Sequence, residues 1–74
     1  MKVRVKLFAT LQKGRFKVSE MEYNEGVTVT EVCRLLDIPK NKVSIIFINN
    51  THADHDRVLQ ENDELALFPP IGGG

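Results

Sequence analysis

Hydrophobic and polar residues alternate strictly over residues 2–8 of the chain. One face of this segment carries Val3, Val5 and Leu7, and the other carries Lys2, Arg4, Lys6 and Phe8. Such alternation predicts a half-buried strand. Residues 64–68 alternate in the same way, with Leu65 and Leu67 pointing inward, and predict the last strand. Because these two strands have the best aliphatic faces, we expect them to form the central pair of a sheet.

A second strand is expected after a short hairpin loop at residues 12–14, in which Gly14 is able to take a positive φ. The apolar positions of this strand change from even-numbered to odd-numbered along its length, at Phe16, Val18, Met21 and Tyr23. This change predicts a β-bulge near Ser19 and Glu20.

One amphipathic helix is predicted over residues 29–37. Its apolar residues recur at the i, i+3, i+4 and i+7 spacing of one helix face: Val29, Val32, Cys33 and Leu36. Thr28 and Glu31 form a capping-box pattern, in which the threonine accepts from the Glu31 amide and the Glu31 carboxylate reaches back. Pro39 is expected to stop the helix.

The rest of the chain predicts shorter elements. Residues 43–48 (VSIIFI) indicate a strand, followed by a turn at Asn49 and Asn50. We interpret residues 51–56 as a polar loop, residues 56–59 as a single helical turn and residues 62–63 as another turn. The order of strands around one helix predicts an α+β domain, with the helix covering one face of a four- or five-stranded sheet.

The composition is that of one small globular domain. The 74 residues are 42% hydrophobic and 27% charged, which argues against disorder. Ten basic and ten acidic side chains give a formal net charge of zero, so bulk electrostatics favours neither nucleic acid nor an anionic membrane. The longest apolar run, residues 45–48, is too short to span a membrane, and no signal-peptide pattern opens the sequence. The expected location is cytoplasmic.

The last seven residues, FPPIGGG, have no evident role in a packed core. Glycine loses the most conformational freedom on ordering, and it has no side chain to pack. We therefore expect this tail to serve a partner that accepts a bare backbone in a narrow channel.

The whole sequence resembles those of the ubiquitin-like sulfur carriers, and it is most similar to the family of molybdopterin synthase small subunits. The segments VKLFATLQ, RVLQENDELALFPP and ALFPPIGGG carry this resemblance. The thiamin-pathway sulfur carrier is a sister family. Gly72 departs from the pattern, because relatives more often have a small side chain there. The resemblance implies a β-grasp fold, with a mixed sheet and one main helix.

The resemblance also implies a function for the tail. In the family, a ubiquitin-activating-like adenylyltransferase uses ATP to adenylate the terminal glycine, here Gly74, and a sulfur donor then converts it to a thiocarboxylate. The synthase large subunit receives the sulfur. The chain would thus be a non-catalytic carrier with no stably bound cofactor, because its partner uses the ATP.

The resemblance divides the chain into a β-grasp domain at residues 1–68 and a tail at residues 69–74. Within the tail, proline and glycine would have different roles. The prolines, Pro69 and Pro70, would stiffen the base and direct the tail away from the domain. The glycines Gly72 and Gly73 would keep the tip thin enough for a channel.

A docking surface is expected near the root of the tail. By alternation, Phe8 and Phe68 fall on the outward faces of their strands, with Ala66 beside them. If the two strands are neighbours, these residues form an exposed apolar patch that a partner covers. The alternative is a pair of aromatic side chains partly covered by a loop.

Three other groups of residues favour a structural interpretation over a functional one. Cys33 lies on the apolar helix face, which predicts a buried thiol rather than a nucleophile. The polar-loop residues His52, Asp54, His55 and Asp56 have no further fixed ligand beside them, so we expect no metal site. The basic residues Lys2, Arg4, Lys6, Arg15 and Lys17 predict a solvated face or a surface for an acidic partner, rather than a nucleic-acid site.

The same activated end is compatible with other functions. A ubiquitin-like protein modifier joins its terminal glycine to lysines, and a thiamin-pathway carrier donates sulfur to a thiazole. A β-grasp module that only binds other proteins is the third alternative.

Overall fold

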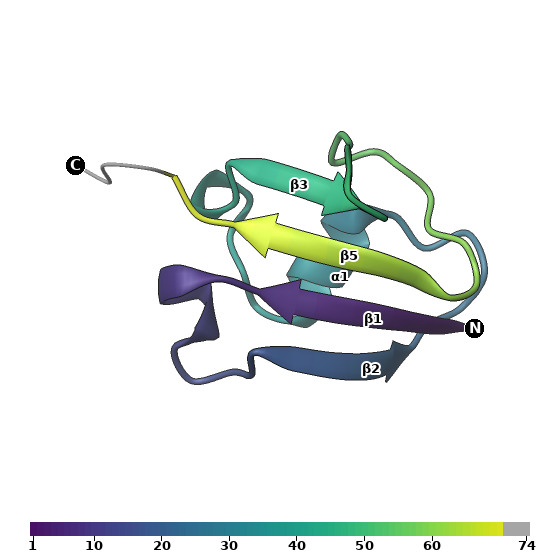
Figure 1. Cartoon of the computed structure of the whole chain (residues 1–74), viewed down its shortest axis with the longest axis horizontal. Helices are drawn as coiled ribbons and strands as arrows, with labels where there is room; N and C mark the ends of the chain where they lie inside the picture. Colours follow the sequence, from purple (N-terminus) through teal and green to yellow (C-terminus); the bar gives the residue numbers. More distant parts are fainter. Residues whose placement is uncertain (71–74) are drawn as a thin grey trace.

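A five-stranded sheet forms the framework of the protein, and the helix α1 (Val29–Leu35) lies across one of its faces (Figure 1). The computed structural model describes residues 1–70. The strands are β1 (Lys2–Leu7), β2 (Val18–Glu22), β3 (Ile45–Ile48), β4 (Thr51–His52) and β5 (Asp63–Phe68). Two short 3-10 helices, η1 (Ala9–Gln12) and η2 (Lys40–Lys42), lie in the connections.

The two strands with the strictest alternation are the central pair, as predicted. The order across the sheet is β2-β1-β5-β3-β4, and β1 runs parallel to β5 while all other neighbours are antiparallel. Val5 pairs with Leu65, and Leu7 with Leu67. The α+β class, the mixed sheet and the single main helix of a β-grasp fold are thereby confirmed.

The core lies between the inward face of the sheet and α1. From the sheet, Val3, Val5 and Leu65 are 0% exposed, and from the helix, Val29 and Val32 are also 0% exposed. Fully burying one Val or Leu side chain contributes about 1.5–3 kcal/mol. Because both central strands place all their inward residues here, truncating one of these residues should cost more stability than truncating one on the outer face.

The helix begins as predicted, although half of the predicted capping box is absent. The Thr28 hydroxyl accepts from the Glu31 amide at 3.2 Å. Within residues 1–70, the Glu31 carboxylate makes no bond back to Thr28 and instead lies 3.8 Å from the Arg34 guanidinium. A cap of this kind is worth about 1 kcal/mol.

The helix ends at Leu35, before the predicted limit, and the backbone itself ends it rather than Pro39. Asp37 has a φ of +57°. Its amide donates to Arg34 O at 3.1 Å, and the Ile38 amide donates to Cys33 O at 2.9 Å. These two bonds define a Schellman motif, in which the left-handed residue after the C-cap closes the last turn.

The predicted bulge in the second strand is wrong. The pairs of β1 and β2 run one to one from Lys2–Glu22 to Lys6–Val18. The strand starts at Val18 rather than Phe16, and the Val18 side chain is 52% exposed on the outer face. The apolar positions therefore change from even-numbered to odd-numbered because the apolar residue Val18 faces outward. The pairing of β1 with β2 continues without an inserted residue.

The connection between β1 and β2 is longer than the predicted hairpin loop and contains η1. Gly14 has the expected positive φ, +71°.

Two later strands start close to their predicted positions. The strand β3 begins two residues later than predicted, at Ile45, whereas β5 begins one residue earlier, at Asp63.

The segment after β3 differs from its prediction in two places. Thr51 and His52 form a short strand, because the positive φ of Asn49 (+53°) and Asn50 (+66°) makes the two-residue turn of a tight hairpin. Residues 56–59 form no helical turn: Val58 bridges to Thr28, and the Leu59 amide donates to Val27 O at 2.9 Å. Leu59 needs this extended backbone to enter the core, where it is 1% exposed.

Candidate functional site

The face of the sheet opposite α1 has an apolar half next to the end of β5. The rings of Phe8 and Phe68 stack, with centroids 4.2 Å apart and an interplanar angle of 11°. Phe47 meets Phe68 edge-on at 5.8 Å, and its backbone pairs with Ala66. We call Phe8, Phe47, Ala66 and Phe68 the aromatic patch; all four side chains are half-buried.

The structure therefore brings the three expected docking residues together, but their exposure is lower than expected. Phe8 and Phe68 cover each other by stacking, which removes part of each ring from water. Phe47 is a member that the sequence prediction missed. Its position between the inward residues Ile46 and Ile48 was the available signal, because alternate residues of a strand face opposite sides. The docking role of the patch stays a prediction.

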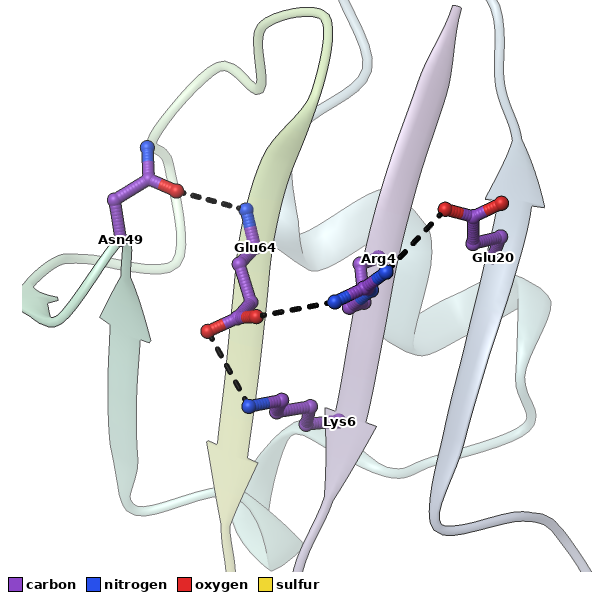
Figure 2. A network of polar contacts seen from close by, with 5 residues as sticks. All are labelled: Arg4, Lys6, Glu20, Asn49 and Glu64. Carbon is purple, nitrogen blue, oxygen red and sulfur yellow. Dashed lines mark hydrogen bonds and ion pairs between the residues drawn. The ribbon is translucent and has the colours of Figure 1, made fainter.

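The other half of this face is charged and electrically balanced (Figure 2). The Arg4 guanidinium lies 3.6 Å from the Glu20 carboxylate and 3.9 Å from that of Glu64. The Lys6 ammonium lies 3.4 Å from the Glu64 carboxylate. The predicted basic stripe is thus interrupted, because carboxylates from β2 and β5 neutralise Arg4 and Lys6. Exposed pairs of this kind each contribute at most about 1 kcal/mol.

Asn49 connects this charged half to the start of β5. Its side-chain oxygen accepts from the Glu64 amide at 2.9 Å, and its side-chain nitrogen donates to the Asp63 carboxylate at 2.8 Å. The other oxygen of that carboxylate accepts from the Gln60 amide at 2.7 Å. Asp63 is only 6% exposed, and these bonds account for both of its oxygens. The buried carboxylate is therefore part of the fold rather than a catalytic group.

The base of the tail lies at one end of the sheet, beyond the aromatic patch. The Ser44 amide donates to Phe68 O at 2.8 Å, which holds the last residue of β5 in place. Pro69 is half-buried and Pro70 is exposed. Both prolines line an open groove of about 970 Å³ together with residues from η1 and from the 38–42 segment. The expected tail residues Gly72, Gly73 and Gly74 lie outside the described residues.

Cys33 is in the core, where it is 3% exposed. Burial raises the pKa of its thiol above the usual 9.0. A thiol is a poor nucleophile and its thiolate a good one, so at neutral pH this side chain is inert. Burial, and then the nearby Cys33, likewise raise the pKa of Tyr23. The predicted structural role of the cysteine agrees with its position.

The two histidines of the polar segment contact neighbouring parts of the fold, His52 through its ring and His55 through its backbone carbonyl. The His52 ring meets Phe47 edge-on at 5.8 Å. His55 O accepts from the Thr30 amide at 2.9 Å and from the Thr30 hydroxyl at 3.0 Å. Across residues 1–70, no three His, Cys, Asp or Glu side chains are grouped so as to hold a metal ion. In the same part of the chain, no helix has the length and apolar character needed to cross a membrane.

The fold and the tail together define a class of protein: a β-grasp domain followed by a segment with prolines at its base and glycines after them. The sequence profile described as the ThiS family matches residues 5–74. This match covers nearly the whole chain, so the chain belongs to the ThiS family of ubiquitin-like sulfur carriers. A comparison with curated protein sequences gives no match.

Solved structures have the same fold at low sequence identity. SAMP1 from Haloferax volcanii matches with a TM-score of 0.75 and 23% identity over 100% of both chains. A Pyrococcus furiosus protein assigned as molybdopterin converting factor subunit 1 matches with a TM-score of 0.75 and 23% identity, over 96% of this chain and 99% of that one. A complex of subunits 1 and 2 of the molybdopterin-converting factor from Helicobacter pylori matches with a TM-score of 0.65 and 22% identity over 100% of both chains.

Proposed function

We propose that this protein carries sulfur on the carboxylate of Gly74 and donates it in the biosynthesis of molybdopterin. The observation that carries the proposal is the family match, which runs through the tail to residue 74. The sequence before the glycines, Phe68-Pro69-Pro70, is the feature that favours the molybdopterin pathway over the thiamin pathway.

The chemistry requires activation by a partner. A carboxylate is a poor electrophile, so an adenylyltransferase first joins it to the AMP part of ATP, and pyrophosphate leaves. A sulfur nucleophile, of which hydrosulfide is the simplest, then attacks the carbonyl carbon and AMP leaves. The catalytic groups belong to the partner. This chain is its substrate and has no catalytic role; it then carries the sulfur, as a thiocarboxylate, to the synthase large subunit.

The division of the chain into body and tail fits this role. Six residues from Pro69 to Gly74 extend at most about 20 Å, enough to reach a buried site from a docked domain. Ordering each of them costs roughly 1–2 kcal/mol. The domain must therefore provide most of the binding free energy, and Phe68 of the aromatic patch directly precedes the tail. We propose Phe8, Ala66 and Phe68, with Phe47, as the docking residues.

The proposed partner follows the arrangement of a relative. The Helicobacter pylori structure is a complex of subunits 1 and 2, and its chain of the same fold aligns with this one over its full length. A synthase large subunit that accepts the tail of this protein would make a corresponding complex.

A second candidate function is protein modification, favoured by the match to SAMP1. A structure of small archaeal modifier protein 1 from Haloferax volcanii also matches, with a TM-score of 0.74 and 23% identity. The activated Gly74 would then form an isopeptide bond with a lysine. Sulfur donation to a thiazole in thiamin synthesis is the third candidate.

One incubation separates these functions. The protein is mixed with ATP, a ubiquitin-activating-like enzyme and a sulfide donor, and its intact mass is measured. A gain equal to one sulfur replacing one oxygen supports the carrier, whereas conjugates on a denaturing gel support the modifier. Adding a synthase large subunit with the molybdopterin precursor, or a thiazole synthase with its substrate, then shows which acceptor takes the sulfur. If neither mass change nor conjugate appears with any activating enzyme, the proposal is wrong.

A further inference from the structure

The zero net charge of the chain conceals a separation of charge between the two ends of the sheet. Figure 1 shows that β1 and β5 end, and β2 and β3 begin, at the end of the sheet from which Pro69 and Pro70 leave. Residues 6–18, 36–45 and 66–70 form this tail end. Its basic residues are Lys6, Lys13, Arg15, Lys17, Lys40 and Lys42, and Asp37 is its one acidic residue. All the other acidic residues belong to the rest of the chain.

Most of these basic side chains have no carboxylate partner. Lys6 pairs with Glu64, and this pair belongs to the balanced half of the sheet face. Within residues 1–70, the other five make no ion pair: Lys13, Arg15, Lys17, Lys40 and Lys42. All five are exposed. We call these five residues the basic cluster.

Three members of the basic cluster lie beside the base of the tail. Lys13, Arg15 and Lys42 line the groove of about 970 Å³ together with Pro69 and Pro70, and none of the described residues that line it is acidic. Any protein that takes up the residues after Pro70 must therefore pass close to these cations.

Hydrogen bonds fix the walls of the groove relative to each other. The Arg15 guanidinium donates to Leu36 O at 3.0 Å and to Asp37 O at 2.8 Å, so the β1–β2 connection is tied to the end of α1. A further bond of 3.3 Å to Leu11 O holds the same guanidinium against η1. Since these acceptors are backbone carbonyls, the positive charge of Arg15 is not cancelled by a carboxylate.

We propose that the groove beside Pro69 and Pro70 docks an acidic segment at the entrance of the protein that takes up the tail. The inference rests on the proposed function for the identity of that protein. Charge complementarity carries it, because a surface with one acid and five cations that make no ion pair within residues 1–70 attracts carboxylates and steers their approach. A single strand of nucleic acid fits less well, since none of the residues within 1–70 that line the groove is an aromatic on which bases could stack.

The test with the natural partner uses two charge-matched variants. Lys13→Glu/Lys42→Glu reverses two cations of the groove and leaves Arg15 in place. Lys2→Glu/Arg57→Glu makes the same change in net charge with exposed residues outside the tail end. Association with the activating enzyme is measured by stopped flow at several NaCl concentrations, and circular dichroism checks that each variant is folded.

We expect the groove variant to associate at least about tenfold more slowly at low salt and to lose most of the salt dependence of the wild type. The control variant should change the rate constant by less than about twofold, since its charges lie away from the docking site. If both variants slow association equally, or neither does, the groove is not an electrostatic docking site.

A second measurement stays decisive even if no activating enzyme acts on the protein. A hexaglutamate peptide is titrated into the labelled protein at low salt, and backbone amide shifts are followed by NMR. Shifts centred on Lys13, Arg15 and Lys42 support the proposal, whereas their absence contradicts it. Anionic phosphatidylglycerol vesicles and an oligothymidylate are titrated in parallel. If the vesicles or the oligothymidylate bind to the groove at concentrations where the peptide does not, the groove is a site for a membrane or a nucleic acid, and the proposal is wrong.

Discussion

The ring of Phe68 lies flat against the ring of Phe8, with their centroids 4.2 Å apart. Phe8 follows the central strand β1, and Phe68 ends the central strand β5. Their contact places an aromatic surface where the tail leaves the domain. Aromatic pairs of this geometry contribute about 0.5–1.5 kcal/mol beyond the area they bury. The same two rings thus stabilise the end of the sheet and form the proposed docking surface.

We expect Phe68→Ala to affect binding more than folding. An aromatic residue at the centre of an interface typically contributes about 2 kcal/mol or more, so the affinity for the activating enzyme or the synthase large subunit should fall by at least roughly thirty-fold. The matched control is Leu67→Ala. Leu67 is 0% exposed in the core, and its truncation should cost about 2–5 kcal/mol of stability. Calorimetric binding and thermal melts of both variants make the comparison. If Phe68→Ala binds normally yet melts below Leu67→Ala, the ring is a core residue and the docking surface lies elsewhere.

Cys33→Ala should lower stability without affecting sulfur transfer. The side chain is buried, so its loss should cost roughly 1–2 kcal/mol in the free energy of unfolding. Transfer should be unchanged, because the chemistry takes place at Gly74. Both are measured on the same preparation, by denaturant unfolding and by intact mass. Loss of transfer in a folded variant would show that the thiol takes part in the relay.

The same residue predicts an alkaline loss of stability. Burial raises the pKa of the Cys33 thiol above 9.0, so the folded state keeps this proton to a higher pH than the unfolded state does. Its contribution is complete below the unfolded pKa and is lost as the pH rises through the folded pKa. The free energy of unfolding should therefore fall above about pH 9, and less steeply in Cys33→Ala. Denaturant titrations between pH 7 and pH 10 are the measurement, and equal slopes in both proteins would contradict the prediction.

Tyr23→Phe should be neutral or stabilising. The Tyr23 hydroxyl is buried and, among residues 1–70, has no hydrogen-bond partner. Leaving such a group unsatisfied costs about 1–3 kcal/mol, and phenylalanine removes it while keeping the ring. Thermal melts at pH 7 test this, and a clear decrease in Tm would mean that the hydroxyl finds a partner in solution.

Asn49→Ala should cost about 1–3 kcal/mol, because it removes one partner of the buried Asp63 carboxylate and one of the Glu64 amide. It also puts alanine at a φ of +53°. Asn49→Gly separates the two effects, since glycine tolerates this φ but lacks the amide group. Asn50→Gly is the control for the turn alone. If Asn49→Gly is as stable as the wild type in urea unfolding, the side-chain bonds contribute nothing.

The parts of the fold that were predictable are those determined by local patterns. β1 and β5 alternate strictly because one face is buried, and the Thr28 cap is a local signal. The bulge was predicted wrongly because Val18 is apolar yet faces outward. The short strand β4 has too few residues to show any period.

The candidate site was predictable only where it depends on the alternation of residues within a single strand. Alternation placed Phe8 and Phe68 on the outer face, and the resemblance placed the tail. The groove was not predictable, because it is assembled from η1, the 38–42 segment and the two prolines, which are far apart in the sequence. The separation of charge was predicted only in part. The sequence placed Arg15 and Lys17 among the basic residues of one face, but Lys13, Lys40 and Lys42 lie in connections for which no local pattern was available.

Locating the mass change along the chain tests whether Gly74 carries the sulfur. The protein is incubated with ATP, an activating enzyme and a sulfide donor, digested, and the peptide that contains residues 69–74 is sequenced by mass spectrometry. A variant lacking Gly74 is the control, and it should keep the thermal melt of the wild type because it alters only the tail. We expect an exchange of one oxygen for sulfur at Gly74 in the wild type and none in the variant. Exchange at another residue, or at the new terminus of the shortened chain, would contradict it.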